Sequence, residues 1–279
     1  MQKYDIKLIA IDLDGTLCYH HGEFIEKNLP ILKKALKNNI KVVLSTGRPF
    51  YITMPVVKKY QLVHHNDNEF IVTYTGASIF DLNLNKEIKR FEISLAKIKQ
   101  IWVKAKQLNI QIWGYQTNEI VVTNKNDFEF CDFDFLVKKH TQKNIEVEED
   151  GLKIKLPFYK AIVKKSKNEE VNLKWINFLN EIKINYYGEN QDYYEITNGN
   201  ISKGKAVEWI ANHLNISLEN VMSIGDSYND LSMFEVSKIS VAMKDGFEIA
   251  KQKATFISKV NHDQGGVESA IKQFVKLPL

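Results

Sequence analysis

The sequence predicts an α/β fold in which a doubly wound parallel sheet is interrupted by an inserted α+β domain. Short apolar runs alternate with amphipathic helical segments at both ends of the chain, which is the pattern of a parallel sheet with crossover helices. The middle of the chain follows a different, mixed pattern. The length of 279 residues suits one large domain with a sizeable insertion, and 44% hydrophobic residues suffice for a core.

The first part of the chain alternates strand and helix. The almost continuous apolar run Ile6–Ile11 predicts a strand buried on both faces. Leu29, Leu32 and Leu36 recur at helical spacing before the strand pattern resumes at 41–44. A second helix is expected from Pro49 to about residue 62, and a third strand over 70–74.

The middle of the chain predicts a separate mixed unit. A long amphipathic helix over 95–108 precedes candidate strands at 110–115 and 120–123. A strand-like stretch at 153–163, a helix through 173–179 and a tyrosine-rich stretch at 184–196 follow. We therefore expect an inserted α+β domain over residues 84–189.

The last part returns to the alternation of the first. The expected elements are helices at 203–214, 230–236, 247–254 and 267–275, and strands at 221–224 and 239–242. Residues 1–83 and 190–279 should therefore build one core.

Composition excludes several classes of protein. No apolar stretch approaches the roughly 18 residues that span a bilayer, and no secretory signal pattern opens the chain, so we expect a cytoplasmic protein without a membrane partner. The net charge is only +4, and the 38 basic residues include only two arginines, Arg48 and Arg90. Arginine is the residue that reads bases and clamps phosphate backbones, so no nucleic-acid partner is expected. Nothing implies an obligate protein partner.

Acidic and hydroxyl side chains directly follow three of the predicted strands. The first strand ends in Asp12-Leu13-Asp14-Gly15-Thr16, the second in Ser45-Thr46-Gly47-Arg48, and a later one in Gly225-Asp226-Ser227-Tyr228-Asn229-Asp230. In an open parallel sheet the ligand site lies beyond the carboxyl ends of the strands. These clusters are therefore expected to share one crevice.

Four carboxylates in one crevice predict a metal ion. Asp12, Asp14, Asp226 and Asp230 would repel one another unless a hard cation lay among them, and ligation by oxygen alone selects Mg²⁺. The alternative is that these aspartates serve turns and helix caps. That alternative fits any one of the clusters but fits all three together poorly.

The same residues resemble a known superfamily. Asp12-x-Asp14-Gly15-Thr16, Thr46-Gly47-Arg48, Lys203 and Gly225-Asp226-x-x-Asn229-Asp230 are similar, in order, to the four motifs of the haloacid dehalogenase superfamily of phosphohydrolases. The position of the insertion resembles the Cof-type branch. The resemblance implies a Rossmann-like core with an inserted cap domain, and a phosphatase that acts on sugar phosphates or nucleotides.

Each step of phosphoryl transfer then has a candidate residue. Asp12 is expected to be the nucleophile that forms an aspartyl-phosphate, and Asp14 the acid and base. The expected phosphate contacts are Thr46, Gly47, Lys203 and Asn229. The expected metal ligands are Asp12, Asp226 and, as the resemblance implies, the backbone carbonyl of Asp14, with Asp230 orienting Lys203 from behind.

Some alternatives stay open at this point. Arg48 could reach the substrate or hold the inserted domain. The spacing from Gly199 to Lys205 imitates a nucleotide-binding P-loop, but Ala206 stands where a hydroxyl must hold Mg²⁺, so a P-loop is not expected. A sugar-phosphate mutase and a non-catalytic sugar-phosphate sensor are the competing functions; the presence of Asp14 argues against the sensor, because mere binding needs no proton donor.

Overall fold

The computed structural model confirms the predicted α/β class. It describes residues 2–20, 22–60, 69–117, 119–123, 144–147 (backbone only), 151, 153–188 and 192–277. The chain forms two compact units. The core unit comprises Met1–Lys89 with Ser202–Leu279, and the inserted unit comprises Arg90–Ile201.

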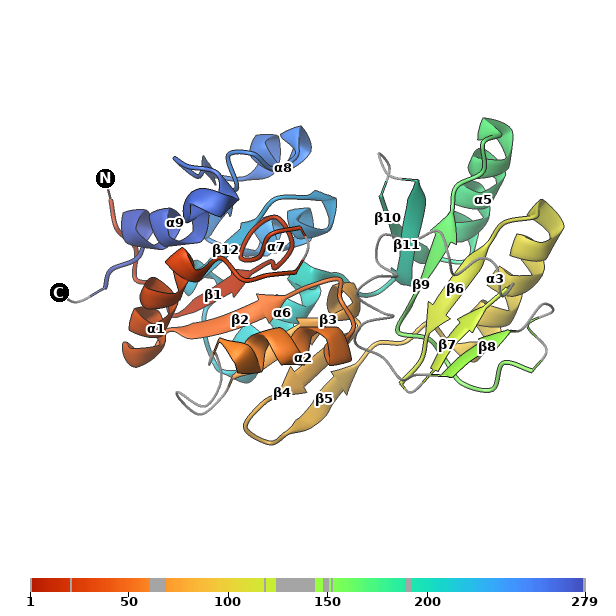
Figure 1. Ribbon diagram of the computed structural model, residues 1–279, viewed down its shortest axis with the longest axis horizontal. Helices are drawn as coiled ribbons and strands as arrows, with labels where there is room; N and C mark the ends of the chain where they lie inside the picture. Colours follow the sequence, from red (N-terminus) through yellow and green to blue (C-terminus); the bar gives the residue numbers. More distant parts are fainter. Residues whose placement is uncertain are drawn as a thin grey trace. The chain divides into compact units, whose positions relative to one another are not determined.

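The core unit is built on an eight-stranded sheet with the order β14-β13-β12-β1-β2-β3-β4-β5 (Figure 1). Neighbouring strands from β14 to β3 are parallel, and β4 runs antiparallel to β3. The strands are β1 (Leu8–Ile11), β2 (Lys41–Ser45), β3 (Phe70–Thr73), β4 (Ser78–Asp81), β5 (Lys86–Arg90), β12 (Val221–Gly225), β13 (Ile239–Ala242) and β14 (Phe256–Ile257).

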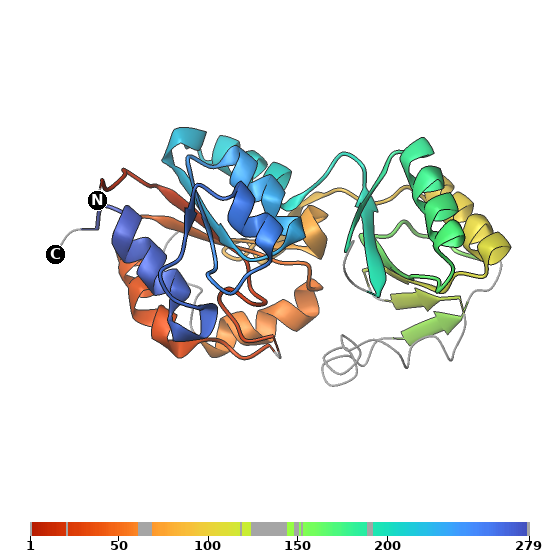
Figure 2. The ribbon, with the colours of Figure 1, turned by 90° about the horizontal axis from the view of Figure 1, so that it is seen from above.

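Helices cover both faces of this sheet, which explains why its central strands are apolar on both sides. Figure 2 shows α1 (Leu29–Lys37) and α2 (Phe50–Lys59) on the face opposite α6 (Lys203–His213). Ile9 and Ile11 pack in one buried cluster with α1 and with α9 (Gly266–Phe274). The remaining helices of the core unit are α7 (Leu231–Val236) and α8 (Glu248–Lys253).

The centre of the sheet joins strands that are far apart in the sequence. β1 pairs with β2 on one side and with β12 on the other, and Leu8 lies opposite Val221. About three-quarters of the chain, including the whole inserted unit, therefore lies between two strands that are hydrogen-bonded to each other. The carboxyl ends of β2, β1 and β12 consequently meet at one edge of the sheet.

In its described residues, the inserted unit is a six-stranded sheet with two helices on one face. The strand order is β10-β11-β9-β6-β7-β8, and α3 (Leu95–Leu108) and α5 (Glu169–Glu181) bury Trp102 and Trp175 against it. Its strands are β6 (Ile112–Tyr115), β7 (Glu119–Val122), β8 (Asn144–Val147), β9 (Lys160–Lys164), β10 (Ile184–Tyr187) and β11 (Tyr193–Asn198). The described pairs are antiparallel except for β7 with β8.

The division between the units differs from the expected one at both crossings. We expected the insertion to span 84–189, whereas the inserted unit begins at Arg90 and ends at Ile201. The first boundary moves because β4 and β5 extend the core sheet. The second moves because β11 pairs with β9 and β10, so the tyrosine-rich stretch belongs entirely to the inserted sheet.

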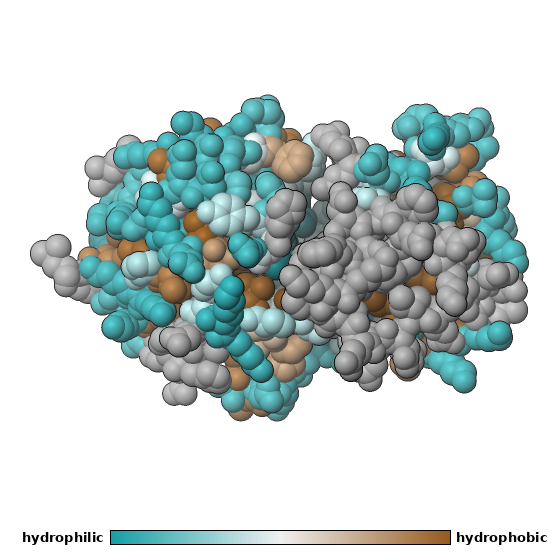
Figure 3. All heavy atoms as spheres, in the orientation of Figure 1, coloured by the Kyte–Doolittle hydropathy of each residue, from teal (hydrophilic) through white to brown (hydrophobic). Residues whose placement is uncertain are grey.

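Hydrophilic side chains cover most of the described surface in the view of Figure 3, as expected for a chain with 26% charged residues. Within the described residues no helix is both long and apolar enough to cross a membrane.

Gly204 is required by the packing of α6 on α7. A Cβ atom at Gly204 would lie 1.9 Å from the backbone oxygen of Ser232, far inside van der Waals contact. Alanine is normally favoured over glycine in a helix by about 1 kcal/mol, but here its Cβ atom would clash with the backbone of α7.

We expect Gly204→Ala to lower the free energy of unfolding by about 2 kcal/mol or more, because overpacking outweighs helix propensity. Thermal unfolding followed by circular dichroism measures the change. Lys205→Ala, one position along on the exposed side of the same helix, is the control and should change stability by less than about 0.5 kcal/mol. A Gly204→Ala variant as stable as the control would contradict the close packing of α6 on α7.

Candidate active site

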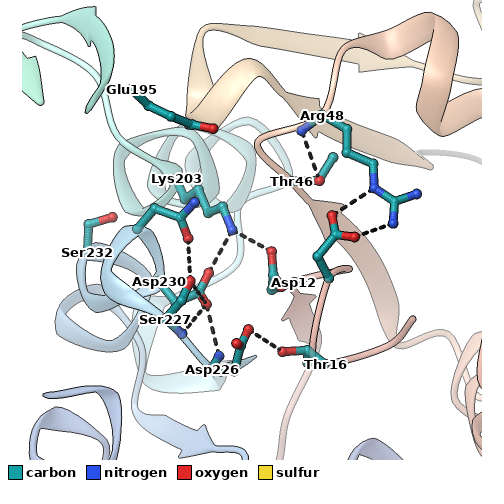
Figure 4. Close-up of polar contacts among 12 residues, drawn as sticks. Asp12, Thr16, Thr46, Arg48, Glu195, Lys203, Asp226, Ser227, Asp230 and Ser232 are labelled. Carbon is teal, nitrogen blue, oxygen red and sulfur yellow. Dashed lines mark hydrogen bonds and ion pairs between the residues drawn. The ribbon is translucent and has the colours of Figure 1, made fainter. Parts of the chain in front are cut away.

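The residues predicted to form a site come together at the carboxyl ends of three neighbouring strands (Figure 4). Asp12 follows β1, Thr46 follows β2 and Asp226 follows β12. Because β1 lies between β2 and β12, the three loops lie side by side at one edge of the sheet. Lys203 reaches the same place from the first residue of α6.

Lys203 links two of the aspartates. Its Nζ atom donates to Asp12 Oδ1 at 2.5 Å and to Asp230 Oδ1 at 2.7 Å, and its side chain is fully buried. Burial by itself would lower the pKa of Lys203, but the carboxylates of Asp12 and Asp230 outweigh it and raise that pKa. The ammonium group is therefore charged at every physiological pH.

Two contacts of the preceding residue, Ser202, place Lys203, one through its side chain and one through its backbone. Ser202 caps α6 by accepting a hydrogen bond from the Lys205 N–H group, at 3.2 Å. The backbone oxygen of Ser202 lies so near Gly76 that a Cβ atom there would approach it to 2.4 Å. Gly76 also has φ of +103°, a conformation that glycine adopts without strain. The Thr75-Gly76-Ala77 segment thus contributes to the site through the backbone.

Asp230 is held from both sides. Its Oδ1 atom accepts from Lys203, and its Oδ2 atom accepts the backbone N–H groups of Asp226 at 2.9 Å and Ser227 at 3.0 Å. Both carboxylate oxygens are therefore engaged, and Asp230 is placed to orient Lys203 and the Asp226 loop. The supporting role expected of Asp230 from the sequence stays a prediction.

Asp12 and Asp226 each keep one oxygen without a hydrogen-bond donor among the described residues. Asp12 uses Oδ1 for Lys203, and Asp226 uses Oδ1 to accept the Thr16 hydroxyl at 3.1 Å. Asp12, Asp226 and Asp230 each offer an oxygen within 4.8 Å of the others, and all three are buried. Among the described residues, Lys203 is the one cation paired with this group, and it contacts Asp12 and Asp230 but not Asp226.

The pKa values show that this cluster lacks positive charge. Burial, opposed by Lys203 and reinforced by Asp230 and Asp14, raises the pKa of Asp12 to about 7. Burial and the charges of Asp12 and Asp230 likewise raise the pKa of Asp226 well above its ordinary value. The fold therefore holds these carboxyls in a place that favours a proton or another cation.

Asp14 differs from the arrangement expected from the sequence. We expected four carboxylates to converge, but the group of three does not include Asp14. Its carboxylate instead pairs with the guanidinium of Arg48, whose Nε donates to Oδ2 at 2.7 Å and whose Nη2 contacts Oδ1. Arg48 is 1% exposed and the Asp14 side chain 36% exposed. The sequence could not assign Arg48, because the pair joins two separate loops.

Backbone hydrogen bonds fix the loop that carries Thr46 and Arg48. The N–H groups of Thr75 and Tyr74 donate to the carbonyl oxygens of Thr46 and Arg48, both at 3.1 Å. Tyr74 and Thr75 have φ of +53° and +57°, which is unfavourable for residues with side chains and above all for a β-branched threonine. Sequence analysis missed this strained segment, which carries no motif of its own.

Four further polar side chains lie at the site. Thr46 Oγ1 accepts the Arg48 N–H at 3.1 Å, so its hydroxyl proton is available to a ligand. Asn229 Oδ1 accepts from the Ser227 hydroxyl at 3.0 Å, which leaves the amide nitrogen of Asn229 as a donor. Thr16 and Ser227 were not predicted as site residues, although both lie inside the motifs.

Comparisons with known proteins agree with this geometry. The family model of haloacid dehalogenase-like hydrolases matches residues 9–271. A relative in Bacillus subtilis (strain 168), 5-amino-6-(5-phospho-D-ribitylamino)uracil phosphatase YcsE, is 27% identical over 275 residues, covering 97% of this chain and 96% of its own.

Solved structures share the fold. A haloacid dehalogenase-like hydrolase from Bacteroides thetaiotaomicron superimposes with a TM-score of 0.79 at 27% identity, covering 96% of this chain and 99% of its own. The HAD subclass IIB sugar phosphatase BT4131 has a TM-score of 0.79 at 22% identity, covering 96% and 98%.

The prediction of an enzyme of the phosphatase class in this superfamily is thereby confirmed. The family model matches almost the whole chain, across both units, and the motifs that carried the resemblance meet at one edge of the core sheet. This chain belongs to the haloacid dehalogenase-like hydrolases.

Proposed function

We propose that this protein is a Mg²⁺-dependent phosphatase that hydrolyses small phosphorylated metabolites, sugar phosphates or nucleotides, through an aspartyl-phosphate on Asp12. The observation that carries the proposal is the environment of the Asp12 carboxylate, that is, its burial and its hydrogen bonding. Its buried carboxylate has one oxygen on Lys203 and the other without a donor among the described residues, beside Asp226. An anionic oxygen held in this way is a nucleophile next to a place for a cation.

The donor set fits a hard divalent cation. Asp12 and Asp226 would bind Mg²⁺ through their unpaired oxygens, with the backbone carbonyl of Asp14, while Asp230 would support the site from behind because both its oxygens are engaged. Burial and the neighbouring carboxylates raise the pKa of Asp12 and Asp226; Mg²⁺ bound there would offset both effects and would reduce the repulsion between Asp12 and a phosphate dianion.

The residues of the chain then divide the reaction into two displacements. A carboxylate oxygen of Asp12 bonds to phosphorus while the bond from phosphorus to the leaving oxygen breaks, and Asp14 gives a proton to that oxygen. A water molecule next attacks the phosphorus of the aspartyl-phosphate and gives its proton to Asp14. This step releases inorganic phosphate and restores the Asp12 carboxylate.

Four residues are proposed to hold the phosphoryl group. Lys203 supplies a fixed positive charge, and the Thr46 hydroxyl and the Asn229 amide each have a free donor. Gly47 lies between Thr46 and Arg48 in the anchored loop, where its backbone N–H can join them. Small phosphorylated metabolites as substrates are supported by the relatives, since YcsE is a 5-amino-6-(5-phospho-D-ribitylamino)uracil phosphatase and BT4131 is a sugar phosphatase.

Replacing the nucleophile should abolish turnover. We expect Asp12→Asn to lower kcat for phosphate release more than about 100-fold, because the amide cannot form the aspartyl-phosphate. Asp5→Asn, the same change at an exposed aspartate, is the control and should keep full activity. Phosphate release from an aryl phosphate measures both. An Asp12→Asn variant with unchanged activity would refute the assigned nucleophile.

Metal binding should stabilise the protein in a pH-dependent way. Because the folded-state pKa of Asp12 is about 7, above the ordinary 3.8, the free protein loses stability as pH rises from about 4 to about 7. A divalent cation compensates only where these carboxyls are ionised. We expect saturating Mg²⁺ to raise the Tm by about 5 °C at pH 8 and by much less at pH 5.

Asp226→Asn separates charge repulsion from metal binding in the same measurement. Without metal, the variant should unfold at a higher temperature than the wild type at pH 8, because one buried negative charge is gone. With Mg²⁺ it should gain little further stability and should stay inactive. Equal stabilisation of both proteins by Mg²⁺ would place the ion elsewhere.

Product analysis separates the phosphatase from a mutase. Incubation with a hexose 1-phosphate and Mg²⁺ should release inorganic phosphate in equal amount to the free sugar, and a chelator should stop the reaction. An isomerised sugar phosphate without free phosphate would establish the mutase instead. Binding without any conversion across a panel of sugar phosphates and nucleotides would favour the sensor.

A further inference from the structure

The pair between Arg48 and Asp14 has no role in the reaction as proposed above. The Nε atom of Arg48 donates to Asp14 Oδ2 at 2.7 Å, and Nη2 contacts Oδ1. Two parallel contacts of this kind fix both the position and the plane of a carboxyl group, which a single lysine contact does not. The pair therefore restricts the rotation of Asp14.

Arg48 is enclosed, whereas Asp14 is open. The arginine side chain is 1% exposed, and the side chain of Asp14 is 36% exposed. A ligand in the crevice can therefore reach the carboxyl group but not the guanidinium behind it. Arg48 Nη1 is also buried and has no acceptor within the described residues. Asp14 is therefore the one residue, among those described, that accepts hydrogen bonds from the guanidinium.

The backbone of Arg48 is itself held in place. Its N–H donates to Thr46 Oγ1, and its carbonyl oxygen accepts from the N–H of Tyr74 in the strained segment. Pro49 follows with φ of −59° and begins α2. Burial would lower the pKa of Arg48, but the hydrogen bonds and charge of Asp14 raise it instead, so the guanidinium stays charged.

We propose that Arg48 is the positioning residue of Asp14, which holds the carboxyl group in the place from which it passes a proton to the leaving oxygen. The inference rests on the proposed function, since it needs Asp14 as the acid. Each oxygen of Asp14 gives one lone pair to Arg48 and keeps another for the proton. Arg48 itself does not touch the substrate.

This role has a consequence that a merely structural arginine would not have. An alkyl phosphate leaves as a strongly basic alkoxide and needs a well-placed acid, whereas a nitrophenyl phosphate leaves as a stable anion and needs little protonation. Loss of Arg48 should therefore slow the first ester far more than the second. In a protein that already lacks the Asp14 carboxyl, loss of Arg48 should have little further effect.

The experiment measures kcat/KM, which reports the steps up to phosphorylation of Asp12, for a hexose 6-phosphate and for p-nitrophenyl phosphate. Arg48→Met should lower the value about 100-fold for the sugar phosphate and less than about 10-fold for the aryl phosphate. Arg48→Met with Asp14→Asn should be within about twofold of Asp14→Asn alone. Arg90→Met, which alters the other arginine, an exposed partner of Glu92, is the matched control and should leave both values unchanged.

Arg48→Lys tests the geometry of the pair and keeps the experiment decisive if Arg48→Met does not fold. Lysine retains the positive charge but cannot make two parallel contacts with the carboxyl group. We expect kcat/KM to fall about 10-fold for the sugar phosphate and about twofold for the aryl phosphate. Circular dichroism and the Tm confirm that each variant is folded.

Two results would overturn the inference. If Arg48→Met lowered kcat/KM equally for both esters, Arg48 would act on something other than the proton transfer by Asp14. If it lowered kcat/KM much further in the Asp14→Asn protein, Arg48 would act independently of Asp14. Neither result touches the proposed function if Asp12→Asn is inactive. If Asp12→Asn retains activity, the proposed function is refuted, and the inference about Arg48 is refuted with it.

Discussion

The ammonium group of Lys203, shared by Asp12 and Asp230, is the interaction on which the rest of the site depends. It is a buried cation at the amino terminus of a helix, where the helix dipole disfavours positive charge, and the two carboxylates compensate for that position. Removing Lys203 would leave two buried carboxylates without their cation. The same three residues join the loop after β1, the start of α6 and the loop after β12. The ion pairs that balance the charge therefore also fix the positions of these loops.

Close backbone approaches position these charges. Gly76 lies against the backbone of Ser202, and Gly204 lies against that of Ser232, so the first turn of α6 is fixed on both sides of Lys203. Tyr74 and Thr75 adopt unfavourable positive φ values while their N–H groups hold the Thr46 loop. Strain of this kind persists where the surroundings fix it, and here it holds a polar loop rigid before any ligand arrives.

The sequence predicted most of the core because its strands are continuous apolar runs. Ile239–Ala242 matches β13 residue for residue, and β1 and β2 differ from prediction by a residue or two at their ends. The edge hairpin of β4 and β5 could not be found in this way, since Lys86–Arg90 is mostly charged and only its pairing makes it a strand. The convergence of Asp12, Asp226 and Asp230 followed from strand ends. The orientation of Asp14 depends on Arg48, which a different loop supplies, and strand ends carry no information about it.

The pairing of β1 with β12 also determines when the candidate active site can form. Asp12 and Lys203 are 191 residues apart, and the complete inserted unit is synthesised between them. During translation the first half of the core must therefore wait, with the partner edge of β1 unoccupied, until the second half leaves the ribosome. A fragment that ends before β12 lacks Asp226 and Asp230 and should be inactive. In a nascent chain that pauses inside the insertion, the unpaired edge of β1 is open to aggregation, and we expect chaperones to bind it.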